Sequence, residues 1–219
     1  MSKTAWALSL LGALFSLTLV AEGVAAQQNM AHVHVGHVRS GFGQTPDGQG
    51  LMQTAIAEAA VAAQHAGLAA RDLTSLADMQ RHTFHVVHAL DPSRIDTGPG
   101  LGFGVKRAAD GVAQHIELAA SSDGASQNVQ THAVHVAASA RTVSQRAEEM
   151  LALTEQIGNA TTAAAAAPLV EQLAELAGQL TSGVDADGDG RVGWQEGEGG
   201  LDQVEQHVGL LARGEGLSD

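Results

Sequence analysis

The stretches "QRHTFHVVHAL" (Gln80–Leu90) and "QTHAVHVAASA" (Gln130–Ala140) share the pattern Q-x-H-x-x-H-V at a spacing of 50 residues. The same shift aligns "GQGL" at Gly48 with "GPGL" at Gly98, and one Gln-His pair at 64–65 with another at 114–115. An internal period of this length with turn residues in its middle predicts a duplicated helical hairpin. Two such hairpins predict an all-α fold, a four-helix bundle with an approximate internal two-fold axis.

The composition also favours helices. Alanine is abundant, tyrosine is absent and only 3% of the 219 residues are aromatic, whereas strands are enriched in aromatic and β-branched residues. Runs of strong helix formers predict helices at 51–70, 73–90, 101–120 and 126–157. Pro92 and the run Gly98-Pro99-Gly100 separate the two hairpins.

The first residues resemble a targeting segment. Lys3 is followed by an apolar stretch, and small residues at Val24-Ala25-Ala26 suit a signal peptidase. We therefore expect a signal peptide at 1–26, a histidine-containing segment at 27–47, the helix bundle at 48–160 and a C-terminal segment at 161–219. The expected location is periplasmic or secreted, with no membrane span left after cleavage.

The charges and the missing cysteines exclude several classes. A net charge of −13 with 11 Lys and Arg argues against a nucleic-acid partner. Without cysteine there are no disulfides, no thiolate metal sites and no covalent c-type haem. Histidine and carboxylate remain as metal ligands.

Three histidines recur in both copies of the repeat. His82 lies near the centre of the apolar stripe of its helix, and His85 lies on the flank of that stripe. His65 is about as far before the hairpin turn as His82 is after it, so the two should meet, and the same holds for His115 and His132 in the second hairpin. Imidazole binds zinc, copper, nickel and haem iron. The alternative is a set of hydrogen-bonded core histidines that both copies inherited. The candidate transition-metal or haem ligands are His65, His82, His85, His115, His132 and His135.

Other histidines receive separate interpretations. In "AHVHVGHV" from Ala31, an extended chain would place two on one side and offer further ligands, but a flexible lead-in or an edge strand fits equally well. We expect His88 and His207 to be solvated surface residues. The possible additional ligands are His32, His34 and His37.

The segment "DADGDGRVGWQE" (residues 185–196) carries acids at alternate positions, then Gly190, Val192 and a closing Glu196. It resembles the EF-hand calcium-binding loop. The resemblance implies calcium ligands from a fixed set of positions: Asp185, Asp187, Asp189, the backbone carbonyl of Arg191, and Glu196.

The flanks of this loop fit the EF hand only in part. A helix should enter from about Pro168 to Leu180 and another should leave from Leu201 to Ala212, with the alanine-rich stretch 161–167 as a linker. A lone loop could pair across a homodimer or fasten its own helices, and a solvated acidic turn without calcium is the alternative.

These features predict an exported calcium-binding protein whose histidine-bearing bundle binds a transition metal for storage, delivery or sensing. A b-type haem electron-transfer protein is one alternative, and a structural or interaction protein with calcium as a staple only is another. An enzyme is least favoured, because no nucleophile arrangement, phosphate loop or paired acid and base is present in the sequence.

Overall fold

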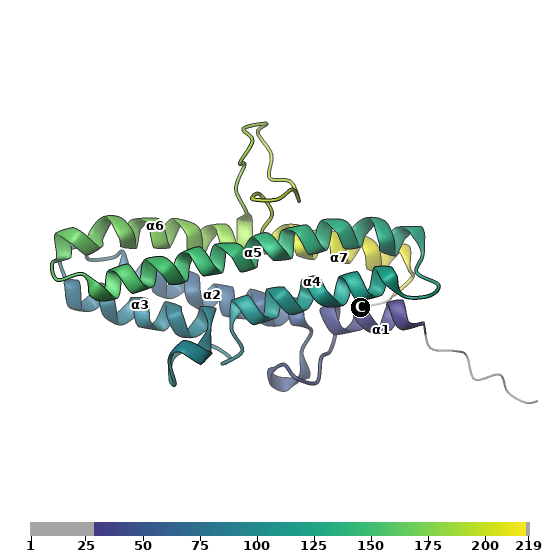
Figure 1. Ribbon diagram of the computed structural model, residues 1–219, viewed down its shortest axis with the longest axis horizontal. Helices are drawn as coiled ribbons and strands as arrows, with labels where there is room; N and C mark the ends of the chain where they lie inside the picture. Colours follow the sequence, from purple (N-terminus) through teal and green to yellow (C-terminus); the bar gives the residue numbers. More distant parts are fainter. Residues whose placement is uncertain (1–28, 218–219) are drawn as a thin grey trace, which may run out of the picture.

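The computed structural model describes residues 29–217, which form an all-α structure without strands in that range (Figure 1). The predicted signal peptide lies outside the described residues. Among residues 29–217, none of the helices combines the length and the apolar character that a membrane span requires. The helices are α1 (Met30–Arg39), α2 (Leu51–Ala69), α3 (Leu76–Leu90), α4 (Val105–Ser121), α5 (Gln127–Asn159), α6 (Ala163–Ser182) and α7 (Leu201–Gly214), with 3₁₀ turns at Pro46–Gly48 and Pro92–Arg94.

Helix α5, with 33 residues, runs through the whole molecule and joins its two halves. In one half α5 packs on α4 and α7, and in the other half it packs on α3 and α6 (Figure 1). Helix α1 completes the first half by packing on α4, and α2 completes the second half by packing on α3 and α6. Each half is therefore a bundle of four helices, and α2 also packs on α4 and connects the halves. A single apolar core extends from α1 to α7.

Side-chain caps explain where several helices start. Ser75, Ser126 and Thr162 each accept a hydrogen bond from a backbone N–H in the first turn of α3, α5 and α6. Because Thr162 caps α6, the alanine-rich stretch that we expected to be a linker forms the first turns of this helix instead. Small side chains allow close packing, as on α2, where one alanine stripe is fully buried: Ala55, Ala59, Ala62, Ala66 and Ala69.

The N-terminal segment is helical, so the expectation of an extended or flexible segment is wrong. Asn29 caps α1 through Ala31 N, and Ala31, Val35 and Val38 are buried against the bundle. Three β-branched valines favour a strand locally, but burying one face at helical spacing outweighs this preference.

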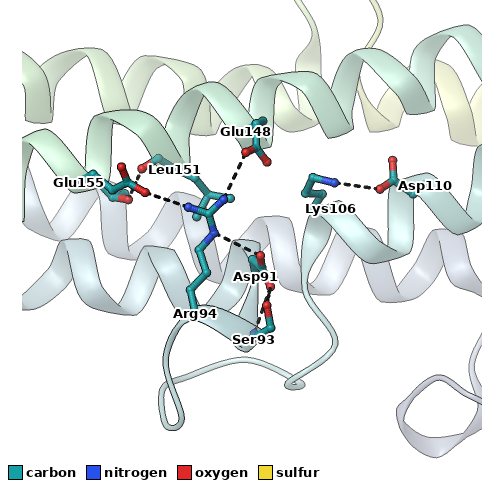
Figure 2. Close-up of polar contacts among 9 residues, drawn as sticks. Asp91, Ser93, Arg94, Lys106, Asp110, Glu148, Leu151 and Glu155 are labelled. Atoms are coloured by element: carbon teal, nitrogen blue, oxygen red, sulfur yellow. Dashed lines mark hydrogen bonds and ion pairs between the residues drawn. The ribbon is translucent and has the colours of Figure 1, made fainter.

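The connection between α3 and α4 is anchored to α5 by Arg94. Its guanidinium donates to Glu155 at 3.0 Å, to Glu148 at 3.2 Å and to Asp91 at 3.3 Å (Figure 2). Beneath this loop, the side chain of the fully buried Glu58 of α2 accepts hydrogen bonds from three backbone N–H groups that precede α4. They are Leu101 N, Phe103 N and Gly104 N, at 3.1, 2.8 and 3.0 Å.

Candidate metal centres

The described residues contain three groups of three histidines, each half-buried between two helices. In every group the candidate ligand atoms lie within 4.8 Å of one another. Three histidine triads on this fold could hold transition metals. We name them by their helices: the α1–α4 site (His34, His37, His115), the α2–α3 site (His65, His82, His85) and the α5–α7 site (His132, His135, His207).

The α2–α3 site is the trio that the first hairpin led us to expect. His65 Nδ1 lies 3.2 Å from His82 Nδ1 and 3.1 Å from His85 Nδ1. The His82 and His85 side chains lie one helical turn apart on α3 and meet a single histidine of the antiparallel α2. Arg81 approaches the outer nitrogen of His82 at 3.5 Å.

The predicted partners of His115 were wrong. Although α4 and α5 form the second hairpin, His115 faces α1, where its Nδ1 lies 3.0 Å from His34 Nδ1 and 3.2 Å from His37 Nδ1. Phe42 packs on this site, with its ring centre 5.0 Å from that of His115 and 5.3 Å from that of His37. The α1–α4 site therefore depends on the helix that the sequence pattern left unassigned.

The partner of His132 and His135 is His207, which we had expected to be a lone surface residue. His207 Nδ1 lies 3.2 Å from His132 Nδ1 and 3.3 Å from His135 Nδ1. The indole of Trp194 is stacked on the His135 ring, with centres 4.1 Å apart and planes at 21°. Two of the three trios therefore join helices that are not neighbours in the chain.

One nitrogen in each trio contacts two others, and a single hydrogen bond cannot account for both contacts. A neutral imidazole nitrogen carries either one hydrogen or one lone pair, so the shared Nδ1 can make one good hydrogen bond at most. A cation at the centre would use all three lone pairs. The shared nitrogen belongs to His115, His65 or His207, respectively.

Burial keeps several of these rings neutral at pH 7. It is the largest cause of the lowered pKa of His34, His65, His82, His115 and His135, and charges on neighbouring rings add to the effect. The pKa of His207 is lowered to about 4 by burial and by the two histidines of α5. Neutral imidazole is the form that binds a metal, so less proton competition is expected at these positions.

A sequence signal for the two unexpected sites exists. The pattern H-x-x-H-V occurs at 34–38, 82–86 and 132–136, and the pattern Q-H-x-x-L occurs at 64–68, 114–118 and 206–210. Each trio combines one copy of each pattern. Counting both patterns over the whole chain would have indicated three sites, although not which helices meet.

The two histidines outside the trios make other contacts. His32 Nε2 lies 2.9 Å from Glu215 Oε2 and joins α1 to α7. His88, expected at the surface, is 7% exposed, and its Nδ1 lies within hydrogen-bond distance, 2.8 Å, of the Pro99 carbonyl. Its burial follows from the loop that folds over α3, which a helical wheel does not include.

The acidic loop between α6 and α7 projects from the bundle (Figure 1). Carboxylate oxygens of Asp185, Asp187 and Asp189 lie within 4.8 Å of one another, and Asp185 accepts from the N–H groups of Gly188 and Gly190 at 2.8 and 2.9 Å. This acidic group is consistent with an EF-hand loop. Glu196 is exposed and does not belong to the group, whereas the buried Glu198 accepts from Gly193 N at 2.8 Å.

Comparisons with models of protein families, with curated proteins and with solved structures find no match to this chain.

Proposed function

We propose that this chain is an exported metal-binding protein that holds three transition-metal ions in its helix bundle and one calcium ion in loop 185–196. The observation that supports the transition-metal sites best is the shared Nδ1 atom at the centre of each trio. In each trio two imidazole nitrogens lie 3.0–3.3 Å from the shared nitrogen, and the three together form a ligand set that a cation completes.

The spacing suits copper, zinc or nickel. Metal–nitrogen bonds of about 2.0–2.1 Å with tetrahedral angles separate neighbouring ligand nitrogens by about 3.3 Å, so small ring movements would complete each site. A trio leaves an open coordination position, as in catalytic zinc sites, whereas structural zinc sites are closed by a fourth ligand. Open sites exchange their ion with a carrier more easily.

We favour storage or delivery over sensing and catalysis. Three chemically alike trios multiply capacity, and each lies at a separate pair of helices. A haem iron bound by two histidines needs them on opposite faces of a macrocycle, with nitrogens about 4 Å apart. Two of the three nitrogen pairs in each trio are closer than that, at 3.0–3.3 Å, so we do not favour the haem alternative.

Calcium would be a local structural ion under this proposal. Asp185, Asp187 and Asp189 already converge, and Glu196 would have to turn inward to close the site as the resemblance implies. Weak single calcium sites fill at the millimolar concentrations found outside cells. A homodimer through the lone loop is a further part of the proposal, and sedimentation with and without calcium tests it.

The full chain, expressed without a histidine tag and stripped by a chelator, should bind three equivalents of Zn²⁺ or Cu²⁺ in a titration followed by elemental analysis. His65→Ala, His115→Ala and His207→Ala should each remove one equivalent, because each removes the shared ligand of one trio. His32→Ala is the matched control and should keep all three. A chain that binds no transition metal, or loses none in these variants, would contradict the proposal.

A further inference from the structure

The three histidine sites differ in what surrounds their rings. Within residues 29–217, the α2–α3 site has ring contacts only among its own histidines, and the α1–α4 site has Phe42. The α5–α7 site has Trp194, whose indole lies parallel to the His135 imidazole at 4.1 Å. The centre of the His207 ring lies 4.5 Å from that of His135, with the two ring planes at 71°.

Trp194 belongs neither to α5 nor to α7 but to the connection between α6 and α7, so something must hold it in place. The Glu198 carboxylate accepts a hydrogen bond at 2.8 Å from the backbone N–H of Gly193, the residue before Trp194. The backbone N–H of Glu198 donates to Gln195 O at 3.1 Å. The Val184 N–H donates to Glu198 O at 2.9 Å and closes the base of the loop. The tryptophan therefore sits on a short, hydrogen-bonded segment.

Helix α5 fastens that segment. Arg146, 5% exposed, donates to the carbonyls of Gln179, Gly199 and Gly197 at 2.8, 3.2 and 3.1 Å. Thr142 Oγ1 accepts from Gly197 N at 3.2 Å. These residues lie on the helix that also carries His132 and His135, so one rigid element positions both the ligands and the base that presents Trp194.

We propose that Trp194 is the positioning residue of the α5–α7 site, fixing the His135 ring for metal and making this site tighter than it would be with histidines alone. This inference rests on the proposed transition-metal function. A ligand ring held by stacking on one face loses less rotational freedom on binding, and partners around a metal ligand typically change affinity by about 10–100-fold. The same stack makes the indole a direct reporter of metal at this site.

The first test isolates the site. In the full chain with His65→Ala and His115→Ala, one equivalent of Zn²⁺ should remain, and its affinity is measured by competition with a chromophoric chelator. Trp194→Ala in this background should lower the affinity about tenfold or more, whereas Trp194→Phe, which keeps a stacking ring, should lower it less than about threefold. Phe84→Ala truncates an exposed aromatic residue elsewhere and should change nothing.

The second test uses fluorescence. The sequence has two tryptophans, so Trp6→Phe leaves Trp194 as the sole emitter. Of three bound Cu²⁺ ions, one should quench the emission, and His207→Ala should abolish this quenching while His65→Ala and His115→Ala leave it intact.

The outcomes separate the two proposals. If the unmodified chain binds three ions, then equal affinity of the remaining site with and without Trp194→Ala, or quenching that survives His207→Ala, would overturn the role of Trp194 and leave the function standing. Absence of transition-metal binding by the unmodified chain would overturn both. Circular dichroism of every variant shows whether the helices are retained.

Discussion

His207 Nδ1 lies 3.2 Å from His132 Nδ1, although 75 residues separate the two in the chain. This contact joins α7 to α5 through two imidazole rings, and an ion bound by both rings would strengthen the connection between the two helices. Metal should therefore act as a cross-link between helices that are distant in sequence, so metal binding should stabilise the folded chain.

Zn²⁺ should raise the thermal stability of the chain. An ion that binds only the folded state adds about 2.7 kcal/mol per site at a free concentration one hundred times its dissociation constant. His207→Ala should lose about one third of the total gain in unfolding free energy measured by denaturant titration. Equal gains in the variant and the parent would contradict binding at the α5–α7 site.

Metal-free protein should lose stability in mild acid. An ordinary histidine of the unfolded chain takes up a proton near pH 6.5, whereas folding lowers the pKa of His207 to about 4. The folded state binds fewer protons between these values, so the unfolding free energy falls as pH is lowered from 6.5 to 4 and is unaffected by this group above 6.5. His207→Leu should flatten the profile measured by urea titration at each pH.

Glu58→Ala should destabilise the protein by about 3 kcal/mol or more, because it leaves the buried N–H groups of Leu101, Phe103 and Gly104 without an acceptor. Glu58→Gln keeps one acceptor oxygen and should show an intermediate loss. Chemical denaturation gives both values. A loss below about 1 kcal/mol for the alanine variant would mean that solvent reaches this loop.

Arg146→Met should lower the unfolding free energy by about 2–4 kcal/mol, since three carbonyls at the base of loop 183–200 lose a charged donor. Arg94→Met is the control, because its ion pairs are exposed and should contribute less than about 1 kcal/mol. Similar losses in the two variants would argue against the anchoring role of Arg146.

Two glycines should respond oppositely to alanine. Gly183 has φ +70°, and a Cβ there would lie 2.4 Å from Glu198 O, so Gly183→Ala should destabilise by about 2 kcal/mol or more. Gly67 lies in α2 with open space around it, and Gly67→Ala should stabilise by about 0.5–1 kcal/mol. Thermal denaturation distinguishes the signs.

Most helices could be predicted from the sequence, because apolar spacing and turn residues mark them directly. The predicted ranges around α2, α3, α5 and α7 differ from the structure by a few residues at most. Helix α1 was not predicted because its valines and histidines have weak helix preference, and its helicity comes from burial against α4. The start of α6 was misplaced because alanine runs suit both a linker and a helix.

The candidate sites were only partly predictable for a different reason. A repeat pattern identifies residues that recur, but the partner of each residue depends on which face of its helix meets which neighbour. His65 and His82 belong to one hairpin, so local arithmetic sufficed. His115 and His132 also belong to one hairpin, yet they face α1 and α7, because α1 packs on α4 and α7 packs on α5.

The three histidine sites lie at three helix pairs, and a fourth pair, α6 with the second half of α5, makes up the remaining quarter of the bundle. This quarter has a related sequence pattern but no histidine ligand. Val170-Glu171-Gln172-Leu173 matches Val204-Glu205-Gln206-His207 except for the last residue, and Leu173, Met150 and Ile157 are fully buried. An apolar interface is stable without any ion, whereas the three quarters that carry histidine trios become more stable when an ion binds. Without metal, backbone amides should therefore exchange with deuterium slowest in this quarter. It would remain stably folded at all times, whereas the other three quarters would become more stable only as they bind metal.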